Sequence, residues 1–274
     1  MTELENKNYP SIGQSFGIAG IMILGSILFA PVIFLNKFID KEAVMLLYYL
    51  LAVGITFWIV YLIRKRKTGN TTFDFKIENK LLIPFVIIAA IALLFGVISP
   101  ISSLIPMPEF IKKVLAGAAS EKGFFTFLLM VIAAPILEEL IFRGIMLDGL
   151  LKRYSPIKAI LISSFLFGLV HLNPWQFITG LFLGVFMGWI YYKTKSISFT
   201  IIIHASVNLT GYLMRVFCDF DSSRTNKTLY GGTLNLVLVI VGCISILAIS
   251  IYYLNREFKK DEIIDSSLRQ ESEA

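Results

Sequence analysis

The sequence carries little charge. Only 16% of its 274 residues are Asp, Glu, Lys or Arg, whereas soluble domains average about 25%. Apolar residues make up 56% of the chain, and the mean hydropathy is +0.76. Several apolar runs reach the roughly 18 to 20 residues that a helix needs to cross a bilayer. These features exclude an ordinary soluble domain and predict a multi-pass membrane protein whose main partner is the lipid bilayer.

Cysteine is almost absent. Cys218 and Cys243 are the only two cysteines, which excludes a disulfide framework and any cysteine-based metal motif. The segment before the first apolar run contains Glu3, Glu5 and Lys7 rather than the basic region of a cleaved signal, so we expect the first helix to be retained. The net charge is +6, but the basic residues cluster beside the apolar runs, where membrane-insertion rules explain them. Nucleic acid is therefore not expected as a partner.

Hydropathy predicts an all-α bundle of about eight transmembrane helices, forming a single integral membrane domain over residues 1–274. The helices are expected near residues 12–35, 43–63, 81–105, 124–147, 156–171, 175–193, 197–216 and 233–254. The fifth and sixth are short and are separated only by residues 172–174, so we expect a hairpin that does not fully span the membrane. In the sixth helix Gly180, Gly184 and Gly188 recur every four residues and predict a face for close helix packing.

The distribution of Lys and Arg predicts the orientation of the chain. The connections at 64–80, 148–158 and 193–196, together with both ends of the chain, carry about twice as many basic residues as the other connections. Both termini are therefore expected on the cytoplasmic side of a cell membrane. The tail over residues 256–274 is polar and charged and is expected to be disordered. The Lys-rich and Ile-rich composition and compact size suggest a bacterial chain.

Three charges lie inside the fourth apolar segment. Inserting a charged side chain at the centre of a bilayer costs about 2.5 to 3.5 kcal/mol. Each of the three is therefore expected to have a function or a partner. Glu139 and Arg143 are one turn apart and are expected to form an ion pair. Glu138 is rotated by about 100° and has no basic residue one turn away, so we expect it to face a functional site. Pro135 removes a backbone hydrogen bond and is expected to kink the helix or admit water.

The two histidines of the chain both fall in predicted membrane helices. His204 and Asn208 share one helix face, and Phe167 has the same spacing from His171. A carboxylate, two imidazoles and an amide in a low-dielectric site are the parts of a hydrolytic centre. Glu138 can take a proton from water, and His204 and Asn208 can stabilise an oxyanion. A shared site requires the two imidazole rings to lie within about 12 Å of each other, and hence a short or tilted fifth helix.

The combination of these motifs resembles the CAAX protease and bacteriocin-processing family of intramembrane endopeptidases. The motifs are Glu-Glu-x-x-x-Arg at Glu138, Glu139 and Arg143, Phe-x-x-x-His at Phe167 and His171, and His-x-x-x-Asn at His204 and Asn208. The resemblance covers about residues 124–211, which we take as the catalytic core of the domain. Removal of the terminal tripeptide from prenylated proteins belongs to the eukaryotic branch of that family. For this chain a membrane peptide or protein, prenylated or not, is the expected substrate.

The resemblance also implies roles for the individual residues. Glu138 is implied as the general base that activates water, and His171 as its partner on that water. His204 and Asn208 are implied as the pair that stabilises the oxyanion. Glu139, Arg143 and Phe167 are implied as supporting residues.

No cofactor is expected, although a zinc site stays open as an alternative. Glu138, His171 and His204 could ligate zinc and leave the other glutamate as the base. Against zinc, the sequence has no His-Glu-x-x-His motif, and Arg143 would compete for Glu139.

Three other interpretations of the polar residues stay open. They could be interhelical hydrogen-bonding groups with a purely structural role. Buried Glu and His are also parts of proton-coupled transporters. Finally, the chain could be a regulatory or bacteriocin self-immunity protein that acts by binding a partner. The oligomeric state is left open.

Overall fold

The structure, a computed structural model, describes residues 8–273 except 112, 114–116, 118–120 and 218–230. All eight predicted helices are present, and the described residues contain no strand. Six of the described helices are long and apolar enough to cross a membrane: Ile12–Lys37, Lys41–Thr68, Leu82–Ser103, Phe124–Leu151, Ile197–Phe217 and Thr233–Lys260. The prediction of an all-α, multi-pass bundle is confirmed.

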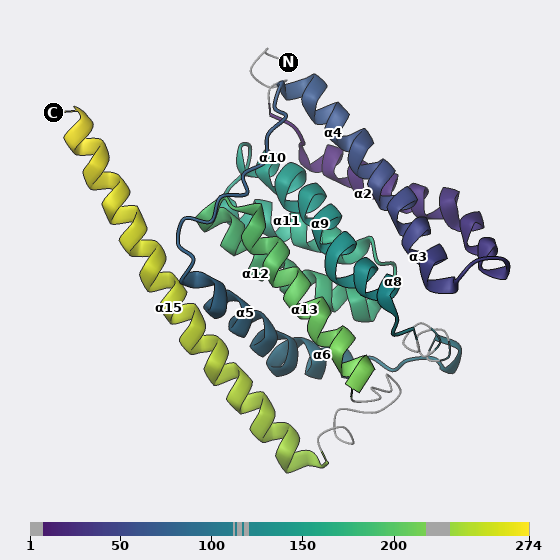
Figure 1. Cartoon of the computed structure of the whole chain (residues 1–274). Helices are drawn as coiled ribbons and strands as arrows, with labels where there is room; N and C mark the ends of the chain where they lie inside the picture. The colour runs from purple at the N-terminus through teal and green to yellow at the C-terminus, as the bar shows by residue number, and fades with distance from the viewer. Residues whose placement is uncertain (1–7, 112, 114–116, 118–120, 218–230, 274) are drawn as a thin grey trace.

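Several spans are composites of helical segments. The first span consists of α2 (Ile12–Phe29) and η1 (Ala30–Lys37), and the second of α3 (Lys41–Tyr49), η2 (Leu50–Gly54) and α4 (Ile55–Thr68). The third consists of α5 (Leu82–Leu93), η3 (Leu94–Ile98) and α6 (Ser99–Ser103). The fourth consists of α8 (Phe124–Phe127), η4 (Leu128–Ala133), α9 (Ala134–Glu139), η5 (Leu140–Leu147) and α10 (Asp148–Leu151). The segments η2, η3, η4 and η5 are π-helical. The chain continues with α11 (Pro156–Leu169), α12 (Pro174–Thr194), α13 (Ile197–Phe217) and α15 (Thr233–Glu273). Figure 1 shows α2 to α4 at one edge, α15 along the opposite edge, and α9 and α13 between them.

The predicted hairpin is formed by α11 and α12. Leu172 adopts a left-handed conformation (φ 54°), which stops α11, and the Asn173 side chain accepts a hydrogen bond from the Gln176 N–H (2.9 Å) at the start of α12. The glycine stripe of α12 lies against α11. A Cβ atom on Gly180 would lie 2.7 Å from the Gly168 Cα, and one on Gly184 would lie 2.9 Å from the Ser164 Cβ. The stripe is therefore a close-packing face, as predicted.

The connections predicted to share one side of the membrane meet at one end of the bundle (Figure 1). The Arg153 Nε donates to the Asn8 carbonyl (2.6 Å), which joins the 148–158 connection to the N-terminal segment. Arg64 pairs with Asp148 (3.6 Å), and the Ile197 N–H donates to the Asp74 carbonyl (2.8 Å). The grouping of these connections thus agrees with the basic-residue pattern, while the cytoplasmic assignment of that end stays a prediction.

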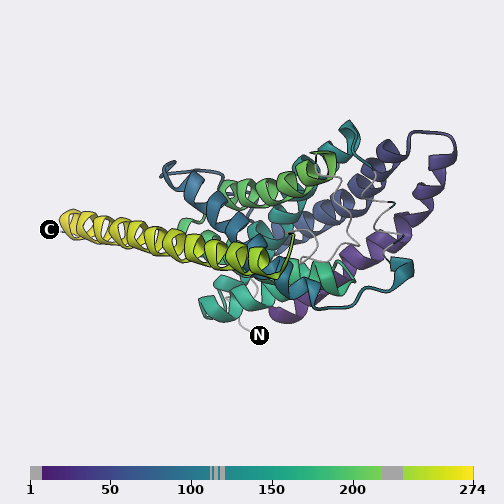
Figure 2. The ribbon, with the colours of Figure 1, turned by 90° about the horizontal axis from the view of Figure 1, so that it is seen from below.

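Helix α15 lies along the outside of the bundle, and its C-terminal end extends past the other helices (Figures 1 and 2). It packs on α5 through stacked Phe85 and Tyr253 rings, whose centroids are 3.9 Å apart. The helix continues through residues 256–273, and the disorder expected for this tail stays a prediction. Phe258 packs edge-on against Trp189. Cys243 of this helix is a free thiol, while Cys218 lies outside the described residues.

Candidate active site

The fourth span carries its two carboxylates between two π-helical segments. In η4 the Ala134 N–H bonds the Leu129 carbonyl, five residues earlier. In the same register the Met130 carbonyl would be bonded by residue 135, but Pro135 has no N–H. Glu138 and Glu139 then follow at the end of α9, directly before η5. Such π-helical insertions are frequent at functional sites because they shift which side chains face a neighbouring helix.

Glu139 and Arg143 form the predicted ion pair. The Arg143 Nη1 donates to the Glu139 Oε1 at 2.8 Å, and both side chains are buried. The guanidinium also donates from Nη2 to the Gly184 carbonyl (3.3 Å) and lies over the Phe167 ring at 4.5 Å from its centroid. Charges buried this deeply are stable only when they are paired and hydrogen-bonded. The pair therefore joins the fourth span to α11 and α12.

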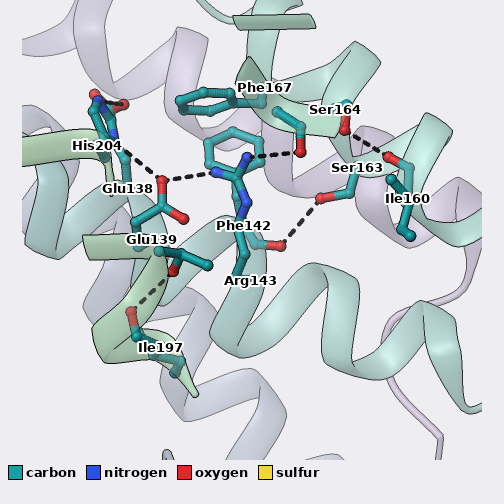
Figure 3. Close-up of polar contacts among 12 residues, drawn as sticks. Glu138, Glu139, Phe142, Arg143, Ile160, Ser163, Ser164, Phe167, Ile197 and His204 are labelled. Atoms are coloured by element: carbon teal, nitrogen blue, oxygen red, sulfur yellow. Dashed lines mark hydrogen bonds and ion pairs between the residues drawn. The ribbon is translucent and has the colours of Figure 1, made fainter. Parts of the chain in front are cut away.

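His204 approaches both carboxylates. The spacing predicts that Glu138 faces the site, and the His204 Nδ1 in addition lies 3.0 Å from the Glu139 Oε1. Figure 3 shows the Glu139 carboxylate between His204 and Arg143. The His204 Nε2 lies 4.0 Å from the Glu138 Oε2. One imidazole thus lies near both carboxylates, because α13 packs against α9. The two glutamates are adjacent in α9, and their side chains point about 100° apart around the helix axis.

Phe167 lies between the two histidines. Its ring centroid is 5.6 Å from that of His171 and 5.7 Å from that of His204, edge-on in both cases. The two imidazole centroids are therefore separated by at most the sum of these distances, which is below the expected limit of about 12 Å. His171 follows the end of α11, which is 14 residues long. His171 donates from Nδ1 to the Phe167 carbonyl (2.9 Å), so in the neutral ring Nε2 is the acceptor.

Asn208 is engaged with the backbone of the fourth span. Its Nδ2 donates to the Met130 carbonyl at 2.8 Å, the carbonyl that Pro135 cannot serve. The expected opening of the helix at Pro135 is thus filled by a side chain from α13. A carboxamide nitrogen has two hydrogens, so one donor of Asn208 is still available for the oxyanion role, which stays a prediction.

Tyr49 is a site residue that sequence reasoning missed. Its hydroxyl donates to the Glu138 Oε1 at 2.7 Å from the last residue of α3. The Glu138 side chain is 12% exposed, whereas that of Glu139 is fully buried. The only available signal was a tyrosine hydroxyl within an apolar helix, which needs a polar partner when buried. Glu138 is therefore held at Oε1 by Tyr49, while its Oε2 lies 4.0 Å from the His204 Nε2.

The geometry also bears on the zinc alternative. Among the described residues, no group of three or more His, Cys, Asp or Glu side chains is placed to hold a metal ion. Glu138 and His204 approach each other, but His171 meets them only through the Phe167 ring. The described residues thus show no assembled zinc site, and the expectation that no cofactor is needed stays a prediction.

Comparisons with known proteins match the segment of the chain that carries these residues. Residues 120–210 match the family model described as Type II CAAX prenyl endopeptidase Rce1-like. The UPF0177 protein YxdF of Lactococcus lactis subsp. lactis (strain IL1403) is 37% identical over 81 residues, which cover 29% of this chain and 44% of the relative. The protein named "Putative membrane peptidase YdiL" of Bacillus subtilis (strain 168) is 34% identical over 85 residues, which cover 31% and 35%. No solved structure matches the chain.

The class of protein follows from the fold and the matched segment together. The chain is a multi-pass helical membrane protein, and its segment 120–210 holds all three motifs of the resemblance. The resemblance to the CAAX protease and bacteriocin-processing family is thereby supported over that segment. The chain spans less than half of the length of each of the two relatives.

Proposed function

We propose that this chain is an intramembrane endopeptidase that hydrolyses a peptide bond of a membrane-associated peptide or protein. The observation that carries the proposal is the position of Glu138, a carboxylate in the membrane with one oxygen anchored by Tyr49 and the other 4.0 Å from the His204 Nε2. A permanently structural carboxylate would be closed off at both oxygens, as buried polar groups usually are. The peptidase relative and the family match support the same activity.

Glu138 acts as the general base in this mechanism. A water beside its Oε2 gives a proton to the carboxylate while the water oxygen attacks the scissile carbonyl carbon. The C–N bond of the resulting tetrahedral intermediate then breaks, and Glu138 returns the proton to the leaving amine. The His171 Nε2, free to accept a hydrogen bond, is the proposed second contact of that water. The open side of Glu138 is where this chemistry requires space.

His204 stabilises the charge that develops on the carbonyl oxygen. Its Nδ1 donates to the Glu139 carboxylate, which fixes the ring orientation. In the protonated ring Nε2–H also donates, and a pre-oriented donor of this kind is an effective oxyanion ligand. The charges balance in this state, because Arg143 offsets Glu139 and the imidazolium offsets Glu138. The second hydrogen of the Asn208 amide completes the oxyanion site.

The proposal is tested by comparing peptides released from cells that express the wild-type chain and the Glu138→Gln variant. Loss of the general base is expected to lower formation of the product peptides by about 10²- to 10⁴-fold, while the amount of folded protein in the membrane stays the same. Glu78→Gln, a change at an exposed loop carboxylate, is the matched control. An identical peptide profile for wild type and Glu138→Gln, with equal expression, would contradict the proposed activity. Prenylated and unprenylated products in the profile distinguish the substrate classes.

The metal-free form of this mechanism has its own test. Purified protein in micelles is incubated with a strong zinc chelator and assayed on a peptide that the cell comparison identifies. We expect cleavage to be unchanged, because every step above is assigned to a side chain. Loss of activity on chelation, with recovery on addition of zinc, would establish the zinc alternative instead.

A further inference from the structure

Two adjacent tyrosines at the end of α3 have different partners. The Tyr48 hydroxyl donates to the Ser26 backbone carbonyl of α2 at 3.1 Å. The Tyr49 hydroxyl donates to the Glu138 Oε1 of α9 at 2.7 Å, across 89 residues of sequence. Either bond satisfies a hydroxyl in an apolar setting. Only the second reaches the carboxylate on which the proposed chemistry depends.

The position of Tyr49 is fixed by a second contact between the same two spans. The Glu42 carboxylate accepts hydrogen bonds from the backbone N–H groups of Gly123 (2.7 Å) and Thr126 (3.3 Å) at the start of α8. These N–H groups have no partner within their own helix, so an acidic side chain there is a stabilising cap. Glu42 and Tyr49 are seven residues, or about two turns, apart and share one face of α3.

The cap also fits closely around Gly123. A Cβ atom at this residue would lie 2.3 Å from the Glu42 Oε2, so the glycine leaves room for the carboxylate in its present position. Because α3 is tied to the fourth span at Glu42, the hydroxyl of Tyr49 is delivered to a defined height on that span. The contact at Glu138 is therefore part of a two-point junction and not an isolated surface bond.

We propose that Tyr49 is a positioning residue for Glu138, which it holds by Oε1 so that Oε2 faces His204 and the attacking water. This inference rests on the proposed peptidase function. A free glutamate side chain samples several rotamers. The transfer of a proton from the attacking water to Glu138 requires a carboxylate that is held in one orientation. The charged or titratable groups that face Glu138 are Tyr49 from α3, Glu139 and Arg143 from its own span, and His204 from α13. Of these, the Tyr49 hydroxyl is the one within direct hydrogen-bond distance.

The test compares Tyr49→Phe with Tyr48→Phe. The substrate is a synthetic peptide that spans a cleavage site identified by its dependence on Glu138 in cells. Losing a hydrogen bond to a charged group is expected to lower kcat of Tyr49→Phe by about 10- to 100-fold. Its KM is expected to change by less than about twofold, because Tyr49 contacts the base and not the substrate. Tyr48→Phe is expected to retain kcat within about twofold.

A double-mutant cycle with Glu138→Asp separates positioning from structural support. The shortened carboxylate cannot reach the Tyr49 hydroxyl, so Tyr49→Phe is expected to lower kcat by less than about threefold in that background. An equal loss in both backgrounds would overturn the inference, as would equal kcat values for Tyr49→Phe and wild type. If Tyr49→Phe does not fold, 3,5-difluorotyrosine at position 49 keeps the ring and the hydroxyl. An altered kcat with the acidified hydroxyl supports positioning, and an unchanged kcat overturns it.

These outcomes are distinct from failure of the proposed function. If Glu138→Gln cleaves the peptides as wild type does, the peptidase mechanism is wrong whatever Tyr49 does. If Glu138→Gln is inactive and Tyr49→Phe is as active as Tyr48→Phe, the mechanism stands and the role of Tyr49 is wrong.

Discussion

The two carboxylates that follow one another at the end of α9 lie in opposite environments. Glu139 is fully buried and meets a guanidinium at 2.8 Å and an imidazole at 3.0 Å. Glu138 is partly exposed, and the hydroxyl of Tyr49 is its hydrogen-bond partner. The buried carboxylate therefore belongs to an electrostatic scaffold, and the proposed mechanism assigns the chemistry to the partly exposed one.

The largest expected effect is the loss of stability when the buried Glu139–Arg143 pair is broken. Arg143→Met leaves Glu139 without its cation, and removing one partner of a buried pair costs about 3 to 5 kcal/mol of unfolding free energy. Glu138→Gln is expected to cost less than about 1 kcal/mol, since it retains a hydrogen-bond acceptor for Tyr49. Denaturant unfolding of the two variants in micelles measures the difference. Equal losses of stability would show that the two carboxylates do not differ in the way their environments indicate.

A second prediction concerns a substitution that shifts α11 without changing any polar group of the site. Gly180→Ala would place a Cβ 2.7 Å from the Gly168 Cα, which forces α11 away from α12 and is expected to cost about 1 to 3 kcal/mol. His171 and Phe167 follow α11, so peptide cleavage is expected to fall as well.

Gly20→Ala is the matched control for this change, because nothing lies within 4 Å of a Cβ at that position. It is expected to be neutral or slightly stabilising, as alanine favours a helix. Thermal unfolding and cleavage measured side by side would contradict the packing role of the stripe if the two alanine variants behaved alike.

Sequence alone predicted the helices because a membrane span leaves a strong hydropathy signal, and the short hairpin because residues 172–174 interrupt it. The Glu139–Arg143 pair was predictable because both residues lie on one helix. The contact of His204 with Glu139 was not, since it depends on how α13 rotates against a span with π-helical segments, where a period of 3.6 residues no longer fixes the facing side chains. Tyr49 was missed because it comes from a distant helix that carries no motif.

The smallest expected effect concerns Asn208, which serves both sides of the comparison. Asn208→Ala removes the donor to the Met130 carbonyl and is expected to cost about 0.5 to 1.5 kcal/mol of unfolding free energy. Pro135→Ala restores a backbone N–H in the register that would bond the same carbonyl. In the Pro135→Ala background, the stability cost of Asn208→Ala is therefore expected to shrink by about 0.5 kcal/mol or more.

The second half of this test measures peptide cleavage by the wild type, Asn208→Ala, Pro135→Ala and the double variant. If the free amide hydrogen of Asn208 stabilises the oxyanion, Asn208→Ala lowers kcat in both backgrounds, because a backbone N–H at residue 135 replaces the helix bond and not the oxyanion donor. Recovery of both stability and kcat on Pro135→Ala would make Asn208 a purely structural residue. Recovery of stability without recovery of kcat would support a role of the Asn208 amide in the chemistry proposed at Glu138.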